Sequence, residues 1–180
     1  MIQKTLRTIL ALLCCTAVLT AQSRTVQTIR KEYQQVKSRI SELKKAGMEG
    51  SLYCLHVEDN VYDASYPATG IYHTHRWFYY EHEGGKPSVL VMVVESQKVA
   101  AGTIYREWMF DNGTFLFGYE KDGYDDNIEK RIYCDGEKLI RYSENNTDIS
   151  YVKAEERITN LKRQAYNILR MFNGFANSGE

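Results

Sequence analysis

Hydrophobic positions near the start of the chain recur with the period of an α-helix. Between residues 24 and 46, apolar side chains return every three or four residues, at Val26, Ile29, Tyr33, Val36, Ile40 and Leu43. This spacing places them on one side of a helix, and Gly47 after two lysines is a typical stop signal. The pattern also fits a coiled coil, but it spans just over three heptads, so we expect the helix to pack on a sheet.

From residue 51 onward the hydrophobic period changes to two, which is typical of β-strands. Strands are expected at 51–58, 70–82, 87–98, 103–111, 114–121, 128–134 and 138–143. The connections are short, and Asn112-Gly113 indicates the tightest hairpin because both residues tolerate a positive φ. Short connections make neighbouring strands antiparallel, so the pattern predicts a β-meander of about six to seven strands. Residues 59–69 break the alternation and are expected to form an ordered loop.

The helical period returns at the end of the chain, with Gly174 as the expected stop and apolar positions at Ile158, Leu161, Ala165, Ile168, Phe172 and Phe175. Two amphipathic helices, one N-terminal and one C-terminal, that flank a meander without a flexible linker predict one α+β domain over residues 22–180, built as two layers. The helical regions are basic, with net charges of +5 over residues 24–47 and +3 over 152–175, whereas residues 48–151 carry −9. Opposite charge favours docking on the sheet, and we expect both helices on one face.

The first 21 residues form a separate unit. Lys4 and Arg7 precede a short apolar run, and Ala21 offers a small residue at the cleavage point, which is the pattern of a secretory signal peptide. The run is too short for a membrane span, which needs about 20 apolar residues. A lipid anchor on Cys14 or Cys15 is less favoured, because neither is preceded by Gly, Ala or Ser. We therefore expect an exported, periplasmic or extracellular protein with no transmembrane segment in the mature chain.

The charge balance and the motifs narrow the function classes. The 23 basic residues match 23 acidic ones, and nucleic-acid binding rests on clustered Lys and Arg, so no nucleic-acid partner is expected. The chain carries no nucleophile elbow, His-Glu-x-x-His helix, phosphate-binding Gly-rich loop or dinucleotide fingerprint, and no cofactor is predicted. A solvated hairpin turn explains the acidic cluster better than a calcium loop does; its members are Asp122, Asp125, Asp126 and Glu129.

Two cysteines, Cys54 and Cys134, lie beyond the predicted signal peptide. In an oxidising compartment they predict one disulfide that closes a loop of roughly 80 residues, and buried free thiols are the alternative. Cys54 also stands two residues before His56, a spacing that permits a thiol nucleophile with an adjacent base. Nothing else in the sequence completes such a site, so the structural interpretations are favoured.

His73 and His75 are the candidate metal ligands. They project from the same face of a strand because side chains alternate, and imidazoles at this spacing can hold a metal ion. A third ligand is expected from Glu81, His82 or Glu83, through strand bending, or from a neighbouring strand. Zinc sites need three or four convergent ligands, so the pair alone is a weak signal. A small secreted hydrolase or metal-dependent enzyme centred on the pair is the alternative function.

Aromatic residues are frequent, with 14 Tyr, 2 Trp and 6 Phe. Along the strand at 70–82 they occupy both faces, with Trp77 and Tyr79 on one and Tyr72, Arg76, Phe78 and Tyr80 on the other. If both helices cover one face, the other row is open, and exposed aromatic rings suit protein surfaces or sugars. We therefore predict a non-catalytic binding or interaction module with a protein or carbohydrate partner. Cross-strand packing is the alternative explanation of these rings.

Overall fold

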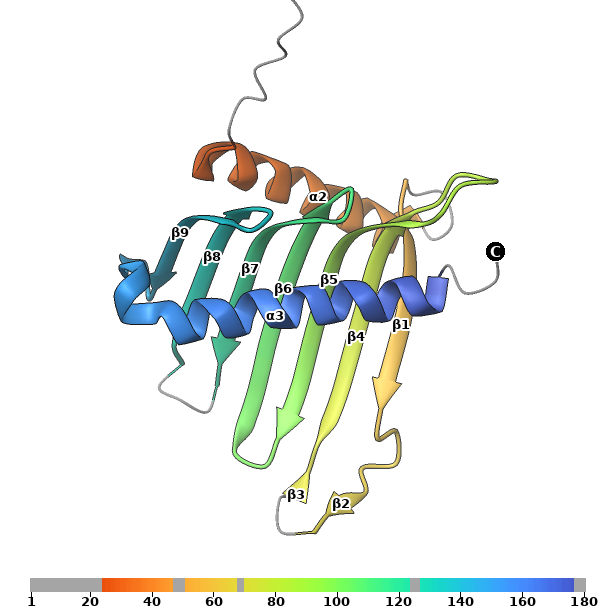
Figure 1. The fold of residues 1–180 in the computed structure, drawn as a ribbon. Coiled ribbons are helices and arrows are strands. Elements are labelled where there is room, and N and C mark those ends of the chain that lie inside the picture. Colours follow the sequence, from red (N-terminus) through yellow and green to blue (C-terminus); the bar gives the residue numbers. More distant parts are fainter. Residues whose placement is uncertain (1–23, 47–50, 68–69, 124–126, 177–180) are drawn as a thin grey trace, which may run out of the picture.

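The computed structural model describes residues 24–46, 51–67, 70–123 and 127–176, so the predicted signal peptide and two members of the acidic turn, Asp125 and Asp126, lie outside the described residues. The described chain begins with helix α2 (Val26–Ala46) and ends with helix α3 (Tyr151–Ala176) (Figure 1). Neither helix of the described ranges is long and apolar enough to cross a membrane. Ten strands lie between them: β1 (Tyr53–Asp59), β2 (Ser65–Tyr66), β3 (Gly70–Ile71), β4 (His73–Glu81), β5 (Val89–Val99), β6 (Gly102–Asp111), β7 (Thr114–Asp122), β8 (Glu129–Asp135), β9 (Lys138–Glu144) and β10 (Thr147–Asp148).

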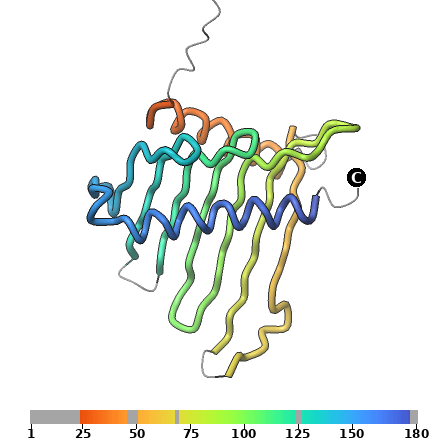
Figure 2. The backbone as a smooth tube through the Cα atoms, in the orientation of Figure 1, coloured from red at the N-terminus to blue at the C-terminus, as the bar shows by residue number. Residues whose placement is uncertain are grey.

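The predicted antiparallel meander is confirmed, with one more strand than expected. The main sheet has eight strands in the order β1-β4-β5-β6-β7-β8-β9-β10, and every neighbouring pair is antiparallel. The backbone trace therefore runs up and down across the sheet (Figure 2). Asn112 and Gly113 adopt φ values of 46° and 78° in the β6–β7 turn, as a tight strand reversal requires. Strands β2 and β3 pair only with each other and form a short ribbon between β1 and β4.

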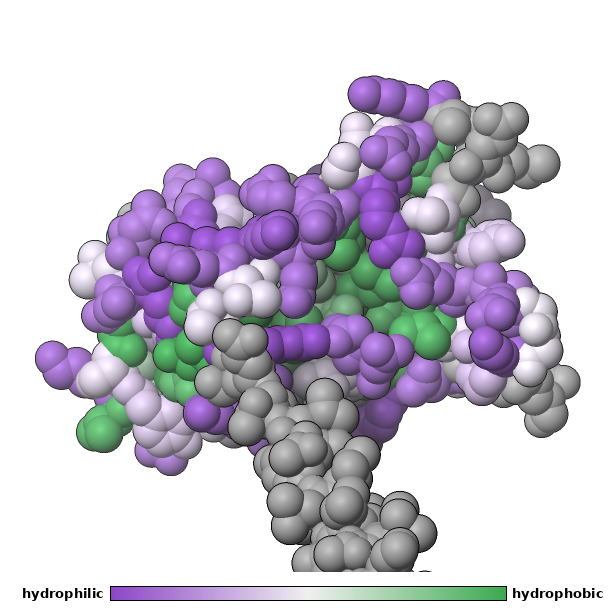
Figure 3. All heavy atoms as spheres, turned by 90° about the horizontal axis from the view of Figure 1, so that it is seen from above, coloured by the Kyte–Doolittle hydropathy of each residue, from purple (hydrophilic) through white to green (hydrophobic). Residues whose placement is uncertain are grey.

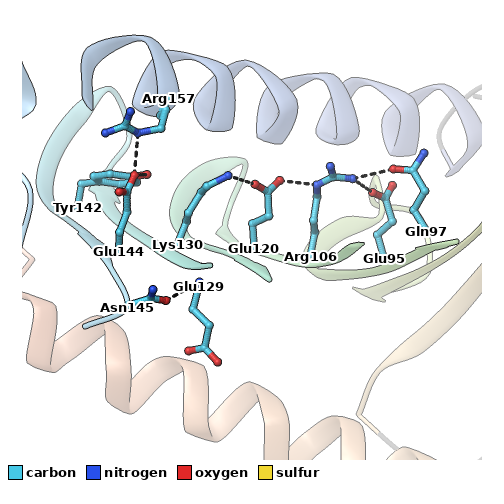
Figure 4. A network of polar contacts seen from close by, with 10 residues as sticks. All are labelled: Glu95, Gln97, Arg106, Glu120, Glu129, Lys130, Tyr142, Glu144, Asn145 and Arg157. Carbon is cyan, nitrogen blue, oxygen red and sulfur yellow. Dashed lines mark hydrogen bonds and ion pairs between the residues drawn. The ribbon is translucent and has the colours of Figure 1, made fainter. Parts of the chain in front are cut away.

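The two helices lie on opposite faces of the sheet, which corrects the predicted two-layer arrangement. Neighbouring residues of a strand point to opposite faces, and in β4 Phe78 belongs to the hydrophobic cluster under α3 while Tyr79 belongs to the cluster under α2. Trp108 and Met109 of β6 divide in the same way. Figure 4 shows the strands between the two helices. The central strands are apolar on both faces, so each face requires its own cover, and the domain has three layers.

Helix α3 packs on the sheet through the apolar side that the sequence predicted. Its buried residues are Ala154, Ile158, Leu161, Ala165, Ile168 and Phe172. The helix does not stop at the predicted Gly174 but continues to Ala176. On the opposite face α2 buries Ile29, Val36 and Ile40. Both stripes are apolar surface removed from water, which is the main source of docking energy.

Each helix covers only part of its face. Helix α3 crosses the strands near their middle, and α2 lies toward the end that carries the β6–β7 turn (Figure 1). Beside α2 a hollow of about 620 Å³ is lined by residues that include Val36, Leu90 and Met109, and apolar residues gather in a hollow between hydrophilic ones when the molecule is seen from above (Figure 3). The opposite ends of β1 and β4, beside the β2–β3 ribbon, lie away from both helices (Figure 1).

A row of paired charges runs along α3 across the sheet (Figure 4). The Arg106 guanidinium donates to Glu95 at 2.7 Å and to Glu120 at 2.7 Å, and Lys130 donates to the other oxygen of Glu120 at 2.7 Å. Glu95 and Glu120 are buried, and buried carboxylates persist only when they are paired. Burial raises the pKa of Glu120, but the hydrogen bonds from Lys130 and Arg106 outweigh burial and bring it below its usual range. Arg76, a predicted binding residue, ends this row by pairing with Glu95.

Candidate metal centre

Four polar side chains meet at the uncovered end of β1 and β4. Strand β1 supplies His56 and Glu58, and β4 supplies His73 and His75. The antiparallel register places Glu58 opposite His75 and His56 opposite Trp77. Residues directly opposite each other share a face, so all four side chains lie on the α2 side of the sheet, beyond the end of that helix.

Three of these residues converge on a common point. His56 Nε2 lies 3.2 Å from His75 Nδ1, and Glu58 Oε1 lies 3.9 Å from the same nitrogen. One ligand atom from each of the three residues lies within 4.8 Å of the others. In a tetrahedral zinc site with bonds of about 2.05 Å, ligand atoms are about 3.3 Å apart. The existing spacing therefore accommodates a metal ion with small movements of the side chains.

His73 has different surroundings from its partner in the predicted pair. Its Nε2 lies 2.7 Å from Glu58 Oε1, and its Nδ1 lies 3.1 Å from Asp63 Oδ1. The hydrogen bond with Glu58, supported by Asp63, raises the pKa of His73 above its ordinary value. With a carboxylate at each ring nitrogen, His73 donates rather than coordinates. It holds Glu58 in place, as outer-sphere partners do in metal sites.

The loop after β1 positions Asp63 beside His73. Asn60 adopts a φ of 59° and its side chain organises the turn: Nδ2 donates to the carbonyl oxygens of Ala64 at 2.9 Å and Tyr72 at 2.7 Å, and Oδ1 accepts from the Ala64 amide. Asn tolerates this left-handed conformation better than most residues. The segment expected to be an ordered loop therefore contributes to the site, and it contains the β2 strand.

Aromatic stacking fixes the imidazole rings. His56 stacks on Trp77 with centroids 4.9 Å apart, and His75 stacks on His56 at 5.4 Å and on His73 at 4.4 Å. The rings form a row across β1 and β4, with Trp77 at its inner end. Stacking restricts the rings in the free protein, where His56 Nε2 and His75 Nδ1 form a hydrogen bond. The two rings are 12° from parallel, so they would have to turn for both nitrogens to point at one ion.

The third candidate ligand comes from the neighbouring strand β1 and not from the end of β4. Glu81 pairs with Arg39 of α2 at 2.6 Å, and His82 lies 3.1 Å from the Ser88 hydroxyl, both at the other end of the strand. Sequence reasoning missed His56 and Glu58 as partners of His75. Their alternation on β1 was a usable signal, but the register that brings them to β4 was not visible.

The predicted aromatic binding face is largely occupied by core packing. Phe78 and Tyr79 are buried, on opposite faces. Tyr80 packs on Phe172 of α3 at 5.3 Å between centroids, and half-buried Trp77 belongs to the histidine row. Tyr72 lies beside the ribbon, against Tyr66. Because the helices cover both sides of the sheet, the expected helix-free face does not exist.

The two cysteines are free and far apart. Cys54 is exposed on β1, whereas Cys134 is buried on β8 in the cluster under α3. Strands β4 to β7 lie between them, which corresponds to about 24 Å at 4.8 Å per strand. A disulfide needs Cα atoms within about 7 Å, so the predicted bridge between them does not form. Burial raises the pKa of Cys134 to about 12.

Comparison with protein-family models, with curated proteins and with solved structures found no match.

Proposed function

We propose that this protein is an exported binding module for a divalent transition-metal ion. The observation that carries the proposal is the convergence of His56, Glu58 and His75, with two imidazole nitrogens 3.2 Å apart. Export is supported by the signal-peptide pattern of residues 1–21. Of the predicted aromatic binding residues, Trp77 lies at this site, where it stacks on the imidazole ring of His56.

The ligand set favours zinc-class ions over calcium or magnesium. Two imidazoles and one carboxylate suit Zn²⁺, Cu²⁺ or Ni²⁺, whereas hard cations prefer all-oxygen sites. The net charge of the three ligands is −1, which compensates part of a divalent charge. The neighbouring His73 and Asp63 keep Glu58 oriented through the 2.7 Å and 3.1 Å contacts.

The site lies at the surface and is open to exchange. The side chains of Glu58 and His75 are 32% and 35% exposed. Three protein ligands leave one tetrahedral position for water or for a donor from another molecule. These features support reversible capture of an ion rather than a role in holding the fold together, because none of the three candidate ligands belongs to either hydrophobic cluster.

Isothermal titration of the purified, chelator-treated protein with ZnCl₂ tests the proposal. We expect one Zn²⁺ per chain in the wild type, and affinity at least about 100-fold weaker in His56→Ala and in His75→Ala, because each loses one of three ligands. His73→Ala should lose about 10- to 100-fold, the range found for outer-sphere partners. His82→Ala is the matched control, since this histidine lies at the far end of β4, and its affinity should equal that of the wild type.

Two results would overturn the proposal. One is the absence of saturable Zn²⁺, Ni²⁺ or Cu²⁺ binding by the wild type. The other is an equal loss in His75→Ala and His82→Ala, which would indicate non-specific imidazole binding. Far-UV circular dichroism of each variant confirms that the sheet is intact.

A metal-dependent hydrolase is the second candidate, and one observation favours it. Two histidines and one glutamate with an open position are the ligand set of several hydrolytic zinc enzymes, and a hollow of about 510 Å³ lined by Lys98 and Ser96 adjoins His73 and His75. Zinc-loaded protein is assayed on p-nitrophenyl acetate against His75→Ala. Zinc-dependent turnover that the variant lacks would favour the enzyme, and equal background rates would favour the non-catalytic module.

A further inference from the structure

A second pocket lies between α2 and the sheet, at a distance along the sheet from the histidine row. It has a volume of about 470 Å³ and is lined by residues of α2, β6, β7 and β8. Pockets that hold small organic molecules span about 300–1,000 Å³. We call it the Tyr–Arg pocket, after its aromatic and arginine lining residues Arg30, Tyr33, Phe117, Tyr119, Arg131 and Tyr133.

The walls of the pocket are aromatic and packed against one another. Tyr33 meets Phe117 edge to face at 5.1 Å, and Phe117 meets Tyr133 at 5.1 Å. Phe117 and Tyr133 are buried, whereas Tyr33 and Tyr119 are half-buried. Burial and the hydrogen bond to Glu107 raise the pKa of Tyr33, so its hydroxyl stays protonated. Rigid aromatic walls of this kind suit an apolar ring, which can pack against their faces and edges.

Two guanidinium groups border these walls. The Arg131 guanidinium lies 5.1 Å from the Tyr119 ring centre and is held by Asn146 at 3.0 Å and Glu129 at 2.6 Å. The Arg30 guanidinium lies 5.6 Å from the Tyr133 ring centre, and its Nε donates to the Tyr133 hydroxyl at 3.2 Å. Within the described ranges no hydrogen bond or ion pair involves the two terminal amino groups of Arg30.

The one buried carboxylate of the pocket is already neutralised. Glu107 accepts hydrogen bonds from Tyr33 at 2.6 Å and from Lys37 at 2.8 Å, and it also bonds to Tyr105. It therefore offers little repulsion to an anion. Lys37 pairs with Glu107 and Arg131 pairs with Glu129. The positive charge that remains for a ligand is therefore that of Arg30. A guanidinium with two parallel donors matches a carboxylate.

We propose that the Tyr–Arg pocket binds a small organic carboxylate that carries a planar ring. The ring packs against the open side of the wall that Tyr33, Phe117 and Tyr133 form, and the carboxylate accepts hydrogen bonds from the terminal amino groups of Arg30. Arg131, which is paired with Glu129, lines the pocket beside Tyr119. The site is independent of the metal centre, which uses β1 and β4, and its ligand needs no metal ion.

Calorimetric titration with indole-3-acetate and with its neutral analogue indole-3-acetamide tests this assignment. We expect the acetate to bind at least about tenfold more tightly than the amide, because only the carboxylate can form the paired contact. Arg30→Gln should weaken acetate binding about tenfold and leave the amide unchanged. Arg170→Gln on α3, on the opposite face of the sheet, is the matched control and should bind both probes as the wild type does. Titration in a chelator and with His75→Ala should give the same affinities, which separates this result from the fate of the metal proposal.

Three outcomes would overturn the assignment. The first is the absence of binding of both probes. The second is equal affinity of the wild type for the acetate and the amide, which would mean that Arg30 does not bind the carboxylate. The third is an equal loss in Arg30→Gln and Arg170→Gln, which would mean general electrostatic attraction.

Discussion

Removing the Phe172 ring should destabilise the protein far more than removing the Phe175 ring one turn later. Both residues lie in the last turns of α3, but Phe172 is 0% exposed and Phe175 is 52% exposed. Phe172 packs on Phe78 and Tyr80 of β4, with ring centres 6.1 Å and 5.3 Å away. The pair of substitutions therefore compares one chemical change at two depths on the same helix.

The expected loss follows from the burial. A buried Phe withdraws about 200 Å² from water, which corresponds to about 5 kcal/mol at 25 cal/mol per Å². Alanine keeps part of that burial, while the vacated volume adds a cavity cost, so Phe172→Ala should lower the free energy of unfolding by about 3–5 kcal/mol. Phe175 has about half of its area in water and leaves no enclosed cavity, so Phe175→Ala should cost about 1–2 kcal/mol.

Urea unfolding followed by far-UV circular dichroism measures both free energies, with the slope of the transition compared between variants. The two losses should differ by at least about 2 kcal/mol. Equal losses, or a Phe172→Ala variant as stable as the wild type, would refute the reasoning that the α3 side of β4 is core and not a binding surface.

Three further predictions follow from burial and charge. Gly118→Ala should destabilise by about 1–3 kcal/mol, because an added Cβ would lie 2.8 Å from Ile132 Cγ2, whereas Gly84→Ala, with nothing within 4 Å, should be neutral in the same urea assay. Replacing exposed Cys54 by Ser should remove a thiol that reacts with Ellman's reagent in the native protein, and Cys134→Ser should leave the native reaction unchanged, because burial raises the pKa of Cys134 to about 12. The pKa of Glu120 is lowered in the folded protein, so its stabilising contribution is present above the unfolded pKa of about 4.3 and is lost as the pH falls below that value. The difference in unfolding free energy between the wild type and Glu120→Gln should therefore shrink between pH 7 and pH 3. A difference that stays constant over this range would contradict the pairing.

The sequence determined the local structure of this protein. The three-four spacing of Ile158 to Phe172 predicted the C-terminal helix, and the alternation after residue 51 predicted most of the strands, because both patterns depend only on the geometry of a single element. The two-residue strands β2 and β10 were not predicted, and the strand expected at 70–82 is divided into β3 and β4. Asn112-Gly113 fixed its own turn for the same reason, since the required positive φ is a property of those two residues. These predictions needed no knowledge of neighbours in space.

Only the tertiary structure decided which face each helix covers and which side chains meet at the candidate metal centre. The opposite charges of the helices and the sheet indicated that they attract each other, but this attraction does not select a face. Strand β4 carries apolar residues on both faces, so its sequence was consistent with a helix on either one. The link between β1 and β4 contains the β2–β3 ribbon, so its length did not set the register, and a shift of one residue would have turned His56 and Glu58 to the other face. The order of strands in the sheet placed β4 to β7 between Cys54 on β1 and Cys134 on β8. Register and layering arise from the packing of the whole sheet, and for that reason the ligand set could not be derived from the sequence alone.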